Sequence, residues 1–489
     1  MDEIELKEKK DGEQDYVKFE NPETGKEINL SSKRKLITII LIIFFGFLII
    51  CSIIIMIIIF KNKKNKCEIG GEEKCLTCSN IKGECASCNP GYILINGKCK
   101  INYSFKAVYY TEANNENIDL IYYLPSEIIE MTVNGKKENP SKNFTFKNSG
   151  NQNVYILMNV DNSTSLNKMF WRIKNLKSII FTDKFDTNNI TTMNDVFASC
   201  SSLTSVDLSI LNTQNVTDIS SLFSLCSSLV FVNLLNFNTE KVKNMNYVFY
   251  GCRSLKSIDL TSFNTKNVEK MDRMFYNCKS LTSINISNFN TENLLHIKSM
   301  FLDCSSLKNL ILPSFDSGKL SVMTYLFSGC SSLTSIDLSN FNTKNIRSLT
   351  QVFYGCTSLV SVNLSNIITD EVYDLSYLFY GCINLSSINI SNFVTNNVKK
   401  MNYMFYNCSS LVSIELSNFN TQSLTELDYM FYFCDKLKYI DISNFTVEGE
   451  KNISLFYDLP DYGEINVNKK FIDKINGQIP INWERNIIG

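Results

Sequence analysis

The residues of this chain with the most varied possible chemistry are its seventeen cysteines, which fall into three groups. Cys51 lies in an apolar run, six cysteines stand between Cys67 and Cys99, and ten are spread from Cys200 to Cys434. Thiols in such numbers can form disulfides, bind zinc or take part in redox reactions. Each group therefore needs its own interpretation.

The six clustered cysteines predict a small module that is stapled by three disulfides. So short a unit cannot bury a sufficient core and needs covalent support. Its two Cys-x-x-Cys pairs could also make a four-thiolate zinc site, although two cysteines would then be left over. The end of the module, from Cys88 through Asn-Pro-Gly-Tyr to Cys99, resembles furin-like and growth-factor-type cysteine-rich modules, and the disulfide connectivity stays open. The predicted disulfide cysteines are Cys67, Cys75, Cys78, Cys85, Cys88 and Cys99.

The ten remaining cysteines recur every 26 residues and define a repeat array. Counted from each cysteine, a leucine stands at +3 and branched aliphatic residues stand at +6 and +8, which is the period-two pattern of a short strand. Apolar residues at +16, +19, +22 and +23 have helical spacing, and Asn-Thr at +12 and +13 are residues that cap helices. Each unit is therefore predicted to be strand, turn, helix, with a core of the type formed by Cys252, Leu255, Phe263 and Phe275.

Stacking such units buries their apolar faces against one another, because no unit can bury its own. The sequence thus predicts an α/β solenoid of about eleven coils with a parallel sheet, at residues 166–447. The β-rich residues 101–165 are expected to cap its first coil, and residues 448–489 its last. Equivalent cysteines in stacked coils would have Cβ atoms about 5 Å apart, beyond disulfide reach, so these ten thiols are expected to be buried and inert.

Residues 330–346, CSSLTSIDLSNFNTKNI, and residues 401–408, MNYMFYNC, resemble the BspA-like leucine-rich repeats of bacterial and protist surface proteins. The resemblance covers about residues 166–447. It implies a role in adhesion to host cells, matrix proteins or other microbes, and it supplies no catalytic residues. The chain departs from that family in having the cysteine module, and before it an apolar segment at residues 36–60, on the N-terminal side of the repeats.

A membrane anchor is predicted from Leu36 to Phe60, where 25 consecutive residues carry no charge. This length exceeds the hydrocarbon core of a bilayer, and a buried core helix seldom lacks a polar face over such a stretch. Residues 1–35 are then a disordered cytoplasmic tail and residues 61–100 the disulfide module. Because disulfides form in oxidising compartments, the C-terminal part is expected to be extracellular on a single-pass protein of the cell membrane.

Two exposed columns of the repeats could bind a partner. The outward strand positions +5, +7 and +9 form a ribbon of Ser, Asp and Asn, which could instead be a solvated sheet face. Positions +21 and +24 carry tyrosines, which suit recognition of proteins or sugars but could also shield the core. The tyrosines of the C-terminal coils are the preferred candidates for partner binding: Tyr377, Tyr380, Tyr403, Tyr406, Tyr429 and Tyr432.

The composition favours binding over catalysis. A net charge of −1 gives no bulk attraction to nucleic acid, and the single histidine, His296, argues against histidine-based catalysis and histidine-rich metal sites. No phosphate loop, paired metal motif or nucleophile elbow is present, so neither an enzyme activity nor a cofactor is expected. The sequence therefore predicts a surface protein that binds an extracellular protein or glycan and no nucleic acid, with a receptor that signals through the short tail as the alternative.

Overall fold

The computed structural model describes residues 103–122, 128–158, 164–315, 318–446 and 453–489, and the backbone of six short strands before them. These strands are β1 (Tyr16–Glu20), β2 (Glu27–Ser31), β3 (Cys75–Cys78), β4 (Cys85–Cys88), β5 (Tyr92–Ile95) and β6 (Lys98–Ile101).

The chain divides into two compact units. One comprises Met1–Ser87 and Asn96–Lys98, and the other comprises Cys88–Ile95 and Cys99–Gly489. In the N-terminal segment β1 pairs antiparallel with β2, so a β-hairpin lies within residues 1–35, where the sequence predicts disorder. The hairpin brings the β-prone pairs Val17–Leu30 and Phe19–Ile28 into register. The strand β3 pairs with β4, and β5 pairs with β6.

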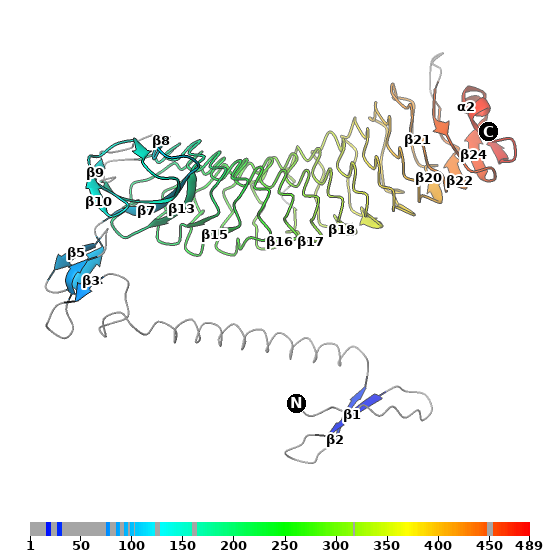
Figure 1. The fold of residues 1–489 in the computed structure, drawn as a ribbon. Coiled ribbons are helices and arrows are strands. Elements are labelled where there is room, and N and C mark those ends of the chain that lie inside the picture. The colour runs from blue at the N-terminus through cyan, green and yellow to red at the C-terminus, as the bar shows by residue number, and fades with distance from the viewer. Residues whose placement is uncertain are drawn as a thin grey trace. The chain divides into compact units, whose positions relative to one another are not determined.

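The larger unit is dominated by a parallel β-solenoid, whose coils follow one another from β13 to β22 in Figure 1. One side of the solenoid pairs short strands, as in Ile284↔Leu310 and Ile336↔Val362. A second side pairs single residues of successive coils, such as Asn244↔Lys270. Each of these pairs joins residues 26 positions apart, which confirms the predicted stack of about eleven parallel coils.

The strands of this unit are mostly three residues long within the coils and longer at the two ends. They are β7 (Phe105–Thr111), β8 (Glu116–Asp119), β9 (Ile128–Val133), β10 (Lys136–Glu138), β11 (Asn143–Phe146), β12 (Gly150–Met158), β13 (Leu176–Phe181), β14 (Ser205–Asp207), β15 (Phe231–Asn233), β16 (Ser283–Asn285), β17 (Asn309–Ile311), β18 (Ser335–Asp337), β19 (Ser361–Asn363), β20 (Ser413–Glu415), β21 (Phe431–Tyr432), β22 (Tyr439–Ile442), β23 (Phe456–Tyr457), β24 (Glu464–Asn468) and β25 (Glu484–Ile488).

The predicted helix in each repeat is wrong. Within the described residues the α-helix is confined to α2 (Lys469–Ile475), which is followed by the 3-10 turn η1 (Asn476–Gln478), and both lie after the repeats. Where a helix was expected, the backbone amides bond to the next coil: Tyr247 N–H donates to the Asp272 carbonyl at 3.0 Å. The residue at +21 has a positive φ, 60° at Tyr247, which a right-handed helix cannot contain. Apolar residues spaced three and four apart thus lie in turns, and the backbone amides of these turns form hydrogen bonds with the next coil rather than within a helix.

The Asn-Thr pair, which the sequence predicts to cap a helix, instead joins neighbouring coils. Asn264 Oδ1 accepts from the Lys266 N–H at 3.2 Å, which is a turn within its own coil. The hydroxyl of Thr265 donates to the Asn290 carbonyl at 2.8 Å, and the hydroxyl of Thr239 accepts from the Asn264 N–H at 2.8 Å. Because these threonines are buried, a column of hydroxyls connects the backbones of successive coils.

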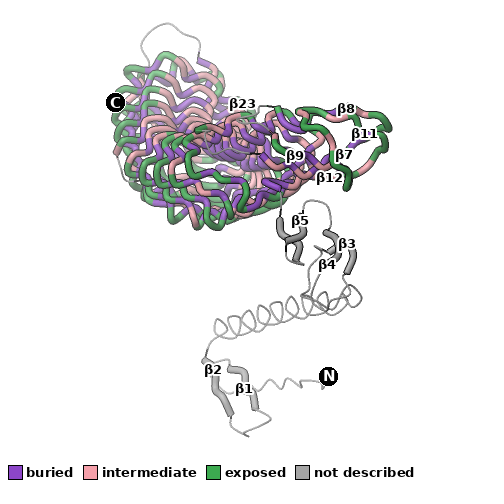
Figure 2. The backbone as a smooth tube through the Cα atoms, turned by 90° about the vertical axis from the view of Figure 1, so that its left-hand side faces the viewer, coloured by how far each residue is buried: buried purple, intermediate pink, exposed green. Residues whose placement is uncertain are grey.

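The interior contains an unbroken column of phenylalanines, which stand at +23 from Cys200 to Cys408 and continue into the coils at both ends. Their rings stack at centroid distances of 5.4–5.9 Å with interplanar angles of 1–18°. Figure 2 shows that buried positions recur along every coil. The column consists of Phe170, Phe197, Phe223, Phe249, Phe275, Phe301, Phe327, Phe353, Phe379, Phe405, Phe431 and Phe456.

Both ends of the solenoid are covered. At the N-terminal end β7 pairs antiparallel with β13, so that the order β10-β9-β12-β7-β13-β14-β15 makes one continuous sheet. At the C-terminal end β24 and β25 continue the order β20-β22-β24-β25. The side chain of Gln478 takes the place of a further coil: its Oε1 accepts from the N–H groups of Leu455 at 2.6 Å and Phe456 at 3.0 Å, and its Nε2 donates to the Ile453 carbonyl.

None of the helices found in the described part of the chain has the length and apolar character needed to cross a bilayer. The predicted span from Leu36 to Phe60 lies outside those residues.

Replacing the buried Thr239 with valine should lower the free energy of unfolding by about 1–3 kcal/mol, because the change leaves the Asn264 carbonyl and the Asn264 N–H without their shared partner. The control is Thr282→Val, since Thr282 is exposed and its hydroxyl makes one long bond of 3.3 Å to Lys256. Urea unfolding followed by circular dichroism measures both variants. Equal effects would contradict the proposed role of the threonine column.

Removing the amide of Gln478 should destabilise the C-terminal end of the solenoid. Gln478→Ala is expected to cost about 1–3 kcal/mol, because buried backbone donors lose their acceptor. Hydrogen exchange at Leu455 and Phe456 should accelerate most. The exposed Gln422→Ala should change the stability by less than about 0.5 kcal/mol. Unchanged exchange at Leu455 in the Gln478 variant would show that the cap contributes nothing.

Candidate functional site

The six predicted binding tyrosines lie together on one face of the C-terminal coils. At +21, the rings of Tyr377, Tyr403 and Tyr429 stack at 4.8 Å per step. At +24, Tyr354 joins Tyr380 at 4.6 Å, and Tyr380 joins Tyr406 at 4.7 Å. Tyr432 continues this second column at 6.4 Å from Tyr406. We call these two columns the tyrosine ladder.

The two columns of the tyrosine ladder also contact each other. The ring centroids of Tyr377 and Tyr380 are 5.8 Å apart, and those of Tyr429 and Tyr432 are 4.8 Å apart with their planes at 79°. The +21 tyrosines have φ values of 57–61°, so the backbone of the coil, rather than a helix face, sets their direction. The sequence predicts that the +21 and +24 tyrosines lie side by side because they share a helix face. They do lie side by side, but because residues three apart are neighbours in these turns.

The stacked rings cover one another's faces, while the side chains stay partly exposed. Tyr403 and Tyr406 are half-buried, and Tyr429 is 36 % exposed. The hydroxyls of the six predicted tyrosines form no hydrogen bond with any other described residue. Burial first, and the neighbouring tyrosines after it, raise the pKa of Tyr377, Tyr380 and Tyr403, so these phenols stay protonated donors at neutral pH. The tyrosine ladder therefore presents rows of hydroxyls and ring edges.

The polar ribbon is the second binding surface that the sequence suggests. Its aspartate side chains already accept hydrogen bonds within their own turns. Asp259 Oδ1 accepts from the N–H of Thr261 at 2.9 Å and from its hydroxyl at 2.7 Å, and these bonds lower the pKa of Asp259. Asp337 bonds in the same way to the N–H of Ser339 at 2.8 Å. Because the strongest acceptors of the ribbon are already used within each coil, we favour the tyrosine ladder.

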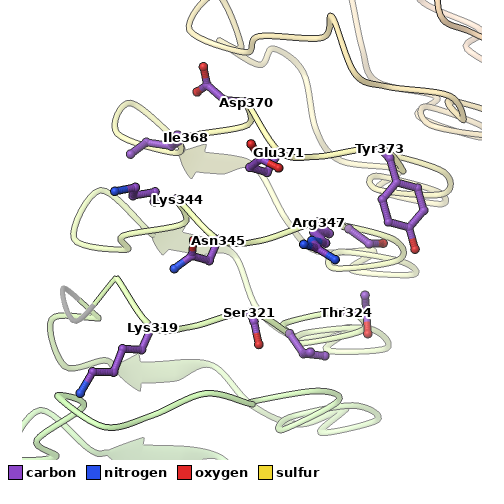
Figure 3. A pocket seen from close by; sticks show the side chains of 12 residues that line it. Lys319, Ser321, Thr324, Lys344, Asn345, Arg347, Ile368, Asp370, Glu371 and Tyr373 are labelled. Carbon is purple, nitrogen blue, oxygen red and sulfur yellow. The ribbon is translucent and has the colours of Figure 1, made fainter.

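An open groove of about 970 Å³ crosses three coils near +14 to +18 (Figure 3). Lys319, Lys344 and Arg347 supply positive charge, and Asp370 and Glu371 supply negative charge on the next coil. The lining thus has no single sign of charge. Among the described residues, no group of three or more His, Cys, Asp or Glu side chains is arranged to hold a metal ion.

The four residues predicted for the core lie in the interior at 0–4 % exposure. They are Cys252, Leu255, Phe263 and Phe275. All ten repeat cysteines are free and buried. Each thiol donates to the carbonyl of a phenylalanine in the preceding coil at 2.9–3.2 Å, as Cys252 does to Phe223. Burial raises the pKa of these thiols, to about 12 for Cys278 and Cys356, so they are poor nucleophiles. The side chains of the six cysteines between 67 and 99 lie outside the described residues, and their disulfides stay a prediction.

The paired coils define the described part of the chain as a parallel β-solenoid repeat protein, and one face of its C-terminal coils carries the tyrosine ladder. A family model described as "Mycoplasma protein of unknown function, DUF285" matches residues 139–253, 212–312, 281–387 and 321–445. These overlapping matches run from 139 to 445, more than half of the 489 residues, and the chain therefore belongs to this family.

Two solved structures resemble the chain. A leucine-rich repeat protein from Eubacterium ventriosum is 15% identical, with 56% of this chain and 91% of that chain covered and a TM-score of 0.23. The TLR13–ssRNA13 complex is 17% identical, with 53% of this chain and 49% of that chain covered and a TM-score of 0.15. No curated protein matches the chain.

The stability of the solenoid should fall as the pH rises above about 9. Folded thiols stay neutral because burial raises their pKa, whereas unfolded thiols ionise near pH 8.5. The stabilisation is thus complete below the ordinary thiol pKa and declines toward pH 12, by up to about 1.4 kcal/mol per pH unit for each thiol. Urea midpoints at pH 7, 9 and 10 measure this decline.

Alkylation supplies the control for this prediction. At pH 8 in native buffer, iodoacetamide should leave the ten repeat cysteines unmodified, and in urea it should modify all ten, as read by peptide mass spectrometry. Modification of any repeat cysteine in the folded chain at the rate of a free thiol would contradict the buried assignment.

Proposed function

We propose that this chain is a single-pass protein of the cell surface whose solenoid binds an extracellular protein or glycan and so mediates adhesion. The uncharged segment from Leu36 to Phe60 supports the anchor. The cysteine module that follows it supports an oxidising exterior for the C-terminal part. In this arrangement the module acts as a spacer between membrane and coils.

The observation that carries the binding role is the tyrosine ladder. Six phenols stand in two columns, at steps of 4.7–4.8 Å and, between Tyr406 and Tyr432, of 6.4 Å, and their hydroxyls have no partner among the described residues. Tyrosine offers a large contact area and a polar tip at a small cost in conformational entropy. Stacking fixes the rings before any partner arrives, which reduces the entropy lost on binding.

The arrangement of the rings also limits the kind of partner. Because most ring faces in the tyrosine ladder are covered by a neighbouring ring at 4.6–4.8 Å, a partner contacts ring edges and hydroxyls rather than stacking on the faces. A surface with many regularly spaced donors and acceptors is suited to a partner with repeated polar groups, such as a matrix protein or a glycan chain.

Cells that display the full chain should adhere to at least one member of a panel of immobilised matrix proteins and glycans. In the double variant Tyr403→Phe, Tyr406→Phe the rings still stack but two hydroxyls are lost, so adhesion should weaken about tenfold. The control is Tyr462→Phe, because Tyr462 is 70 % exposed and lies outside the tyrosine ladder. Antibody staining of intact cells corrects for the amount displayed.

Either of two results would contradict the proposal. If the antibody reached the solenoid only after permeabilisation, the chain would not be presented outside. If adhesion survived the double variant unchanged, the tyrosine ladder would not be the binding surface.

A further inference from the structure

The +21 tyrosine column has an interruption in the middle of the solenoid. Along successive coils the +21 position is occupied by Tyr247, Arg273, Ser299 and Tyr325. Each of these residues has a φ of 54–61°, so the four side chains leave equivalent backbone positions. Ser299 is the smallest of them. A space that a ring fills in other coils is therefore open between Arg273 and Tyr325.

The interruption forms a recess of about 500 Å³, within the usual size of small-ligand sites. Leu302 replaces tyrosine at +24 in the same coil, which widens the space. We call this space the missing-rung recess. Its principal lining residues are Arg273, Tyr276, Lys298, Ser299, Leu302 and Tyr325.

Two cations of the missing-rung recess lack an acidic partner. Arg273 Nη1 donates to the Tyr247 hydroxyl at 2.6 Å, and its guanidinium carbon lies 5.5 Å from the centre of that ring. Lys298 Nζ lies 5.8 Å from the centre of the Tyr325 ring. Neither cation forms an ion pair with a carboxylate of the described residues.

Two carboxylates lie near these cations. Asp272 pairs with His296 at 3.7 Å and accepts the N–H of Lys298 at 2.7 Å. Asp303 is close enough to Tyr276 to raise its pKa, after the larger effect of burial. Neither residue lines the recess. A ligand anion would therefore meet two positive groups that aromatic rings hold in place.

A small side chain lines the recess between these cations. Ser299 is only 2 % exposed, so it leaves the space between Arg273 and Tyr325 unfilled where a tyrosine would occupy it. Two cations and several tyrosines around this space indicate a polar and negatively charged ligand.

The spacing along the +21 column suits one six-membered ring. Arg273 and Tyr325 stand two coils apart, and each step between parallel strands is about 4.8 Å. A ring placed midway would lie about one step from each side chain, as each tyrosine does in the tyrosine ladder at 4.6–4.8 Å. Here, unlike in the tyrosine ladder, the Tyr325 ring has serine rather than tyrosine before it in the column.

We propose that the missing-rung recess binds an acidic sugar, a pyranose that carries a carboxylate. The ring lies between Arg273 and Tyr325, the carboxylate meets Arg273 and Lys298, and the sugar hydroxyls bond to the surrounding phenols. The number of hydroxyls around the recess favours a sugar over an acidic peptide. This inference deepens the proposed function by naming a ligand class, and it concerns a site separate from the tyrosine ladder.

The test titrates the full chain with sodium D-glucuronate, sodium N-acetylneuraminate and neutral D-glucose by saturation-transfer NMR. At least one acidic sugar should bind at least ten times more tightly than glucose, and its binding should weaken as salt is raised. Ser299→Tyr should abolish this binding, because tyrosine already occupies the same backbone position in other coils and would fill the recess. Gln351→Tyr, on the far side of Tyr325 in the same column, is the matched control and should bind normally.

A second variant tests the recess with a milder change, so that a loss of binding is not explained by misfolding. Lys298→Gln removes one charge from a half-exposed side chain and should weaken binding of the acidic sugar at least fivefold while the circular dichroism spectrum stays unchanged. Equal binding of glucose, unchanged binding in Ser299→Tyr, or tighter binding of an aspartate-rich peptide than of either acidic sugar would overturn the proposal. Loss of adhesion in the tyrosine-ladder variant with retained sugar binding, or the reverse, separates this inference from the proposed function.

Discussion

The structure depends on backbone hydrogen bonds that join each coil to its neighbours at a constant step of 26 residues. Amides of one coil donate to carbonyls of the next on the turn side, as from Phe249 to Met274 at 2.9 Å, while short parallel strands pair on the other side. With two bonded sides, a coil cannot shift by one residue without losing both sets of bonds. Like residues are therefore placed above like residues throughout the array.

The side-chain columns follow from this register. Phenylalanine rings stack on phenylalanine rings, buried threonine hydroxyls join backbone groups of adjacent coils, and each cysteine thiol reaches a carbonyl of the preceding coil. These columns satisfy the polar groups that a solenoid of tight turns would otherwise bury without partners. The last coil has no further coil to bond to. The side-chain amide of Gln478 therefore takes the place of the missing peptide group.

The register also determines where the chain can vary its surface. Changes at interior columns disturb two neighbouring coils, whereas changes at outward turn positions alter only the surface. The +21 and +24 positions are such places. Continuous tyrosine there yields a ridge of phenols in the C-terminal coils, and a single serine among larger residues yields a recess beside Arg273. One scaffold therefore carries two chemically different surfaces without any change in the fold.

Much of this architecture follows from the sequence alone. The 26-residue period, the buried columns such as Leu255 and Phe275, and the neighbouring +21 and +24 tyrosines are properties of the repeat itself, because any stack in register must superpose equivalent residues. The turn that replaces the predicted helix was decided by tertiary structure. Apolar spacing of three and four fits either a helix or a turn with a positive φ, and only bonding to a neighbouring coil favours the turn. The missing-rung recess is likewise tertiary, since the space beside Ser299 exists only because the coils before and after it place larger side chains on either side.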